Sequence, residues 1–161
     1  MRLKNKLLYF YNYKIKCSIG KRGLTRKKRE GDLKTPKGKF KFKFLLYRKD
    51  RIKKIHCKLK TKKINKNMGW CDDPGSIYYN RLIKFPFNKS AEKLYLKKNI
   101  YDLILVMNFN TKPIVKNRGS AIFLHIKNKK SSPTKGCVAI QKKDFLKILP
   151  LITKKTVFLI S

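Results

Sequence analysis

The clearest hydrophobic pattern in the chain is the alternation Lys-Phe-Lys-Phe-Lys-Phe over residues 39–44. Successive side chains of a strand point to opposite faces, so this segment is predicted to be a strand with its three Phe on one face and its Lys on the other. The four residues before it, Thr35-Pro36-Lys37-Gly38, predict a turn, because Pro fixes φ and Gly tolerates a positive φ. This turn is expected to position the Phe-bearing strand.

Continuous apolar segments predict three further strands, over residues 100–109, 120–126 and 156–160. Residues 58–67 are almost all Lys, Asn, Thr and Ile, a composition typical of a solvated hairpin or loop. No internal repeat, low-complexity tract or linker interrupts the sequence. Residues 1–161 are therefore expected to form a single domain.

Two short segments predict helices. Ser90 can cap a helix that runs to Lys97, with Glu92 in its first turn. Residues 144–149 carry apolar side chains at helical spacing, and Pro150 ends or bends that helix. Many short strands with one or two short helices indicate a mainly β (α+β) fold, either a sandwich or a barrel.

The chain carries 44 Lys and Arg against 8 Asp and Glu, a formal net charge of +36 at pH 7. This charge disfavours a cationic partner and a metal ion held only by carboxylates. A cationic module that binds nucleic acid or another anionic polymer is one alternative function. However, the basic residues are mainly Lys and lie in nearly every segment, so no specific nucleic acid is expected as a partner.

The apolar segments are too short for a transmembrane helix. The longest uninterrupted apolar runs have five residues, whereas a membrane-spanning helix needs about 20. The basic N-terminal residues are followed by an apolar stretch too short for the core of a signal peptide, so no export signal is visible. We expect a protein without a transmembrane segment.

His125 and Cys137 are the candidate reactive pair. A thiol becomes a strong nucleophile when a neighbouring base or positive field lowers its pKa. One polar loop separates the two residues, which is enough to fold the imidazole back against the sulfur. Gly136 permits a close backbone approach and an unusual φ, and the N–H groups of Gly136 and Cys137 are candidate oxyanion donors. Considered alone, the His and the Cys would fit ordinary packing positions as well.

Two segments around this pair resemble the catalytic motif of the L,D-transpeptidase (YkuD-type) domain family. They read GSAIFLHI over residues 119–126 and PTKGCVAI over residues 133–140. Upstream, residues 29–38 (REGDLKTPKG) resemble an early Gly-Asp and Thr-Pro-x-Gly element of the family. Further similar features are the segments Gly69-Trp70-Cys71-Asp72-Asp73, Tyr79-Asn80 and Tyr101-Asp102. The resemblance extends from about residue 20 to residue 161, in the order expected for the family.

The resemblance implies an L,D-transpeptidase-like β-sandwich and a cysteine acyltransferase without a cofactor or metal. Cys137 matches the nucleophile and His125 the general base, which in the family is oriented by a backbone carbonyl, here of Ile126 or of the 131–136 loop. The thiolate attacks a peptidoglycan stem peptide, a terminal D-amino acid leaves, and an amine resolves the thioacyl enzyme. Water in place of the amine would make the protein an L,D-carboxypeptidase.

Two positions depart from the family pattern. A His that often precedes Gly-Cys is replaced by Lys135, and an Arg that often lies two residues after the Cys is replaced by Ala139. Anchoring of a substrate carboxylate would then fall to Lys135 or Arg118. A member that has kept the fold and lost catalysis is a further alternative.

The expected cleft has a lip at Gly119 and Ser120, and the polar 127–135 loop flanks it. Further substrate-binding candidates are Thr134, Lys135, Trp70 and Asn80, although Trp70 fits a core aromatic position equally well. The expected partners are peptidoglycan stem peptides, and the protein is expected to be a monomer. The resemblance places it in the periplasm or cell envelope, and leaves open whether the acyl acceptor is a stem peptide, a protein, a D-amino acid or water.

Overall fold

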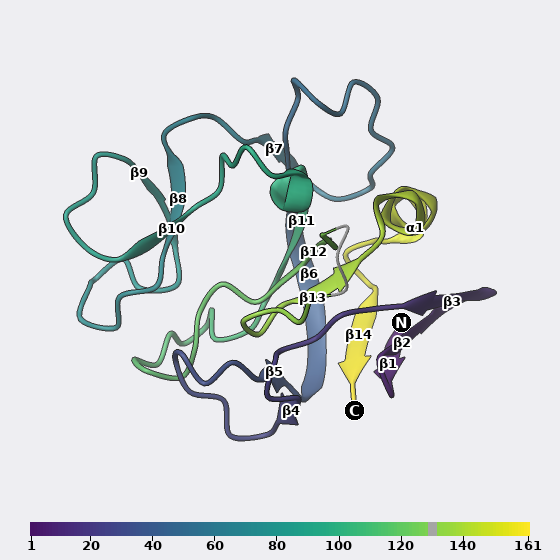
Figure 1. The fold of residues 1–161 in the computed structure, drawn as a ribbon, viewed down its shortest axis with the longest axis horizontal. Coiled ribbons are helices and arrows are strands. Elements are labelled where there is room, and N and C mark those ends of the chain that lie inside the picture. Colours follow the sequence, from purple (N-terminus) through teal and green to yellow (C-terminus); the bar gives the residue numbers. More distant parts are fainter. Residues whose placement is uncertain (129–131) are drawn as a thin grey trace.

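The computed structural model describes residues 1–128 and 132–161, and within these residues a mixed sheet of nine strands forms the centre of the molecule (Figure 1). Eight strands follow the order β13-β12-β11-β6-β14-β1-β2-β3, and β7 pairs with β6. Their bounds are β1 Arg2–Lys4, β2 Leu7–Phe10, β3 Tyr13–Lys16, β6 Gly38–Tyr47, β7 Thr61–Lys63, β11 Leu103–Met107, β12 Phe123–Ile126, β13 Val138–Ile140 and β14 Val157–Ile160. The expectation of a mainly β fold with short helices is confirmed.

Smaller elements surround this sheet. A second sheet has the order β10-β8-β9 and lies apart from the central strands in Figure 1, and a short pair joins β4 to β5. Their bounds are β8 Met68–Cys71, β9 Leu82–Lys84, β10 Ala91–Lys93, β4 Leu24–Thr25 and β5 Thr35–Pro36. The helical elements are α1 Lys142–Ile148 and the 3₁₀ turns η1 Asn99–Tyr101 and η2 Leu149–Leu151.

Two hydrophobic cores lie on the two faces of the β6–β11–β12–β13 part of the large sheet. Neighbouring residues on one strand alternate between them, so that Leu124 packs in the first core and Phe123 in the second. The first core also takes in side chains of β1–β3 and of α1, such as Leu8 and Phe145. The second core joins the large sheet to the small one through Trp70 of β8.

The predicted strand at residues 39–44 is present as part of β6, but its three Phe do not share one face. The register of β6 with β11 shifts between Val106, opposite Phe44, and Met107, opposite Phe42. This bulge adds one residue to β6 and turns Phe44 into the second core, whereas Phe40 and Phe42 belong to the first. The alternating pattern correctly predicts the strand, and the bulge inside it has no signal in that pattern.

The predicted helix over residues 90–97 is wrong. Residues 91–93 form β10, in which Ala91 pairs with Cys71 and Lys93 with Gly69. Pairing with β8 outweighs the capping signal at Ser90, whose hydroxyl donates instead to Asp72. By contrast, the second predicted helix is present as α1, and Pro150 lies in the 3₁₀ turn that follows it.

Three other boundaries differ from the sequence-based expectation. Thr35-Pro36 is the short strand β5 and not a turn, because it pairs in parallel with β4. The 58–67 segment includes β7, which pairs in parallel with β6. The apolar segment 100–109 begins with the turn η1 and becomes a strand only at Leu103. Among the described residues, the structure contains no helix long and apolar enough to span a membrane.

Candidate functional site

The parallel pairing of β12 with β13 brings the two predicted reactive residues to the same face of the sheet. Leu124 lies opposite Val138, and His125 lies opposite Ala139. Side chains alternate along each strand, so His125 faces the same side as Phe123 and Cys137, both of which belong to the second core. His125 and Cys137 line one cavity of about 740 Å³.

The thiol of Cys137 is buried and hydrogen-bonded to the backbone. Its Sγ donates to the carbonyl oxygen of Ala121 at 3.0 Å and accepts from the N–H of Phe123 at 3.3 Å. Burial raises the pKa of this thiol to about 12, and the charge of Glu92 acts in the same direction. The Phe123 N–H and the Lys28 ammonium favour the thiolate but do not offset burial. The thiol is therefore protonated at neutral pH.

The imidazole of His125 is neutral at the same pH. Burial lowers its pKa to about 4, although hydrogen bonding to the backbone of Ile126 and Ile100 favours the protonated form. Its Nδ1 lies 2.9 Å from the carbonyl oxygen of Ile126. Ile126 was one of the two expected sources of an orienting carbonyl, and the structure shows this contact. The Tyr101 ring packs edge-on against the imidazole, with 5.3 Å between centroids.

Within the described residues, no hydrogen bond joins the imidazole of His125 to the thiol of Cys137. The two groups share a cavity wall, and in this structure each is held by backbone groups of β12 or of the residues just before it. The cavity wall thus carries a neutral thiol and a neutral imidazole, each with backbone partners.

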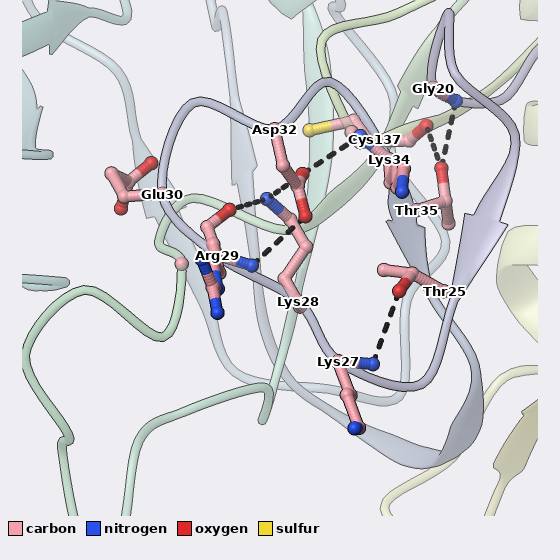
Figure 2. A network of polar contacts seen from close by, with 12 residues as sticks. Gly20, Thr25, Lys27, Lys28, Arg29, Glu30, Asp32, Lys34, Thr35 and Cys137 are labelled. Carbon is pink, nitrogen blue, oxygen red and sulfur yellow. Dashed lines mark hydrogen bonds and ion pairs between the residues drawn. The ribbon is translucent and has the colours of Figure 1, made fainter.

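Two threonine hydroxyls hold the backbone of Cys137 in place. Thr134 Oγ1 donates to the carbonyl oxygen of Cys137 at 2.6 Å, and Thr35 Oγ1 donates to the same oxygen at 3.4 Å. Thr35 Oγ1 also accepts from the N–H of Gly20 at 2.8 Å, as the upper right part of Figure 2 shows. The early Thr-Pro element is therefore tied directly to the cysteine, about one hundred residues later in the sequence.

Asp32 organises the loop that leads to this threonine (Figure 2). Its carboxylate accepts from the N–H groups of Arg29 and Lys34, each at 2.9 Å, and from Lys28 Nζ at 2.6 Å. Burial acts to raise the pKa of Asp32, but these hydrogen bonds lower it below its ordinary value. Lys28 is buried and lines the cavity. Sequence reasoning missed Lys28, because nothing distinguishes it from the many other lysines.

Gly136 has the unusual conformation that the sequence suggested. Its φ is +149°, and a Cβ at this position would lie 3.1 Å from the carbonyl oxygen of Lys34. A side chain here would therefore press on the Asp32 loop. Its N–H donates to Thr134 Oγ1 at 3.1 Å, so this predicted oxyanion donor has an intramolecular partner in this structure.

The other predicted binding residues divide into two groups. Ser120, Thr134 and Lys135 line the cavity together with the reactive pair, and Gly119 precedes Ser120 without being one of the lining residues. Trp70 and Asn80 are buried away from it. Part of the predicted 127–135 loop, residues 129–131, lies outside the described residues.

Trp70 and Asn80 form a structural unit behind the cavity. Trp70 packs edge-on against Phe123 at 5.2 Å between ring centroids, and its Nε1 donates to Asn80 Oδ1 at 2.9 Å. That oxygen also accepts from the N–H of Ala121, and Asn80 Nδ2 donates to the carbonyl of Asn110. For Trp70 the structure supports the core alternative that the sequence left open.

The sequence analysis also missed three carboxylates of the cavity wall. Glu30, Asp72 and Glu92 all line it. Glu92 was expected in the first turn of a helix, and its true place on β10 depends on a strand pairing that no local signal shows. Asp72 belongs to a segment considered for family resemblance, and Glu30, disfavoured with Asp32 as an acid–base pair, belongs to the segment of the early Gly-Asp element.

A comparison with protein-family models finds one that spans nearly the whole chain. The model described as the L,D-transpeptidase catalytic domain (YkuD) matches residues 2–160. The match includes the N-terminal strands β1–β3, for which the sequence carried no recognised motif. Neither the curated proteins nor the solved structures contain a significant match.

Proposed function

Because the chain belongs to the family of L,D-transpeptidase catalytic domains, we propose that it is a cysteine L,D-transpeptidase that acts on peptidoglycan stem peptides in the cell envelope. One observation carries this proposal. His125 of β12 and Cys137, the residue just before β13, line a single cavity, because β12 and β13 are paired neighbours in the sheet. Two threonine hydroxyls hold the backbone of Cys137. A thiol and a candidate base on the wall of one cavity are the two groups that cysteine acyl transfer uses.

In the first half-reaction, Cys137 Sγ attacks the carbonyl carbon that precedes the terminal D-amino acid. The sulfur leaves the Ala121 carbonyl, and its proton passes to His125 as the C–S bond forms. Collapse of the tetrahedral intermediate then breaks the C–N bond, and the imidazolium returns the proton to the leaving amine. The products are a thioester on Cys137 and a free D-amino acid.

In the second half-reaction, an amine attacks the thioester. The C–N bond forms, the C–S bond breaks, and the proton released by the amine returns to the sulfur through His125. Water in place of the amine gives a free carboxylic acid, which would be carboxypeptidase activity. Both outcomes use the same acyl enzyme.

The pKa values support general-base catalysis and not a preformed thiolate–imidazolium pair. The thiol has its pKa raised to about 12 and the imidazole has its pKa lowered to about 4, both by burial. A proton on the sulfur and a free imidazole are therefore the stable resting forms at neutral pH. In this proposal the proton moves while the carbonyl is attacked, when the developing oxyanion compensates the charge on the ring.

Lys135 is proposed to take the carboxylate-anchoring role that the resemblance assigns to a missing Arg. Both Lys135 and Ala139, the residue at the position of that Arg, line the cavity, but only the Lys135 side chain is charged. Ser120 and Thr134, which also line the cavity, are proposed as further substrate contacts.

The first test uses purified protein and a synthetic stem tetrapeptide that ends in a D-amino acid. Mass spectrometry is expected to show release of that residue and a thioester adduct on Cys137. Cys137→Ser is expected to lower the rate at least about a thousandfold, because it replaces the thiol with a hydroxyl, which is a much weaker acid and nucleophile. Cys57→Ser is the matched control, since Cys57 is half-buried and does not line the cavity. Full activity in Cys137→Ser would refute the proposal.

A further inference from the structure

One face of the large sheet carries alternating cationic and apolar stripes. Where β6, β14, β1, β2 and β3 lie side by side, the first core covers one face, and the side chains of the other face are exposed or half-buried. Residues paired across neighbouring strands share a face, so the register of the strands defines its members. They are Lys39, Leu159, Arg2, Tyr9 and Lys14 in one row, Lys4, Leu7 and Lys16 in a second, and Lys41 and Val157 in a third. We call these residues the outer sheet face.

The stripes follow the strands. On this face β6, β1 and β3 present cations, whereas β14 and β2, which lie between them, present only apolar and aromatic side chains. Neighbouring strands are about 4.8 Å apart, so Leu159, Tyr9 and Leu7 each have a cationic side chain on both sides. Tyr9 and Val157 are 41% and 40% exposed, although both side chains are large and apolar. The face thus offers charge and apolar surface together.

No negative charge of the protein balances these cations. Residues 1–29, 33–49 and 145–161, which include all five strands, contain no Asp or Glu. Within the described part of the chain, none of the cations of the outer sheet face forms an ion pair, whereas the buried Lys28 and Arg48 do. The face is therefore complementary to an anionic partner.

Neither a second copy of the chain nor the cavity accounts for this face. Two outer sheet faces brought together would place cations against cations with no carboxylate between them, and this repulsion costs free energy. Among the described residues, no member of the face lines the cavity. In Figure 1, β1–β3 lie across the molecule from the small sheet, which contributes Glu92 to the cavity wall. The face is a surface separate from the cavity.

A lipid surface fits the outer sheet face better than a nucleic acid does. Sheets that bind single strands present several aromatic rings on which bases stack, and Tyr9 is the one aromatic side chain of this face. Five of its six cations are Lys, which lacks the planar guanidinium suited to bidentate contacts with phosphate. Aliphatic side chains between lysines suit a membrane interface, where ammonium groups meet lipid phosphates and apolar groups reach the acyl chains.

We propose that the outer sheet face binds the surface of a membrane that contains anionic phospholipids, an inference that does not rest on the proposed function. The lysines contact lipid phosphates, while Tyr9 and Val157 enter the boundary between headgroups and acyl chains. Tyr suits this place, because its ring is apolar and its hydroxyl can reach water or a headgroup. Binding of this kind holds a protein at a membrane without a membrane-spanning segment.

Sedimentation with lipid vesicles tests this proposal. The purified protein is mixed with vesicles of phosphatidylcholine alone, or with vesicles that contain about one third phosphatidylglycerol, whose headgroup is anionic. We expect binding to the anionic vesicles only, and weaker binding as the salt concentration rises. A variant that combines Lys4→Gln, Lys14→Gln and Lys39→Gln should bind roughly a hundredfold more weakly, because each lysine at an anionic surface contributes about fivefold.

The matched control combines Lys63→Gln, Lys66→Gln and Lys84→Gln, which removes the same charge from exposed lysines outside the outer sheet face. This control should bind anionic vesicles within about threefold of wild type, because salt screens a charge beyond roughly 10 Å. Thermal unfolding verifies that both variants are folded. Equal weakening in the two variants would overturn the proposal, since net charge and not this face would then be responsible.

Tyr9→Ser distinguishes a membrane from a soluble polyanion, because this single substitution keeps every charge. Loss of the ring should weaken binding to anionic vesicles roughly fivefold and leave binding to single-stranded DNA unchanged. Its result is judged independently of the lysine variants, should the triple variant fail to fold. Unchanged vesicle binding in Tyr9→Ser would overturn the proposal, because the face would then be a general polyanion surface. Equal binding of wild type to neutral and anionic vesicles would overturn it as well.

Discussion

At the scale of single residues, a side-chain hydrogen bond joins the early Thr35-Pro36 element to the Gly136-Cys137 element. Thr35 was expected to serve a turn that positions a strand, but its hydroxyl joins Gly20 to Cys137. The side chain is fully buried, so each of its hydrogen bonds replaces one that water would otherwise make. Sequence spacing could not show this link, because it spans two segments that only the folded chain brings together.

Replacing this hydroxyl with a methyl group should destabilise the protein. Thr35→Val keeps the shape of the side chain but leaves the N–H of Gly20 buried without a partner. We expect a loss of roughly 2 kcal/mol in the free energy of unfolding, measured by urea denaturation. Thr25→Val is the control, since Thr25 Oγ1 accepts only from the exposed N–H of Lys27 (Figure 2). A loss of equal size in both variants would contradict this account.

The predicted reactive residues illustrate how far sequence reasoning reaches at this scale. His125, Cys137 and Gly136 could be selected because their types and order are unusual, and the structure brings all three to one cavity. Glu92 and Lys28 could not be selected in this way. Their importance depends on where β10 and the Asp32 loop pack, and neither residue type stands out locally.

At the scale of secondary structure, the alternation of apolar and polar residues predicts the strand at residues 39–44 but does not predict the bulge within it. Residues 39–44 form a strand as predicted, yet the bulge opposite Val106 and Met107 places Phe44 in the second core. Both faces of this part of the sheet carry an apolar core, so composition alone cannot tell which face Phe44 joins. In the same way, Ser90 satisfies a helix rule, but the segment after it completes the small sheet.

The side chain of Asn80 joins the small sheet to the segments before and after β11, so replacing Asn80 should destabilise the protein. It has a positive φ of 55°, and its amide bonds to Trp70, Ala121, Phe109 and Asn110. Asn80→Ala should therefore destabilise the protein by roughly 3 kcal/mol, because several buried groups lose their partners.

Asn117→Ala is the control that separates the effect of the positive φ on the free energy of unfolding from the effect of the lost hydrogen bonds. Asn117 has a similar φ of 61° but is exposed, so its replacement should cost about 1 kcal/mol or less. Thermal and urea unfolding of the two variants give the comparison. If Asn117→Ala is as damaging as Asn80→Ala, the backbone conformation and not the hydrogen-bond network is the main contribution.

At the scale of the whole molecule, burial of His125 links stability to pH. The native imidazole has a pKa of about 4, below its ordinary 6.5, so between these values the unfolded chain binds a proton that the native protein does not. Stability therefore rises with pH across this window and falls as the pH drops from 6.5 to 4. The full effect is on the order of 3 kcal/mol.

Urea denaturation at several pH values tests this linkage. His125→Gln cannot titrate, so the difference in unfolding free energy between wild type and variant should shrink as the pH falls through this window. Cys137 supplies the opposite trend at high pH, because its raised pKa reduces stability as pH rises above 9. A constant difference between wild type and His125→Gln from pH 7 to pH 4 would show that the imidazole is not held neutral.

The pairing of β12 with β13 has a consequence for how this protein can diversify. The ladder that aligns Leu124 with Val138 fixes where His125 lies relative to β13, and Thr134 holds the carbonyl of Cys137 just before that strand. Substitutions at Asn128, Ser132 or Pro133, which line the cavity but lie outside this ladder, would thus reshape the cavity wall and leave the alignment of the strands intact. These three positions are where the shape of the cavity can change without moving His125.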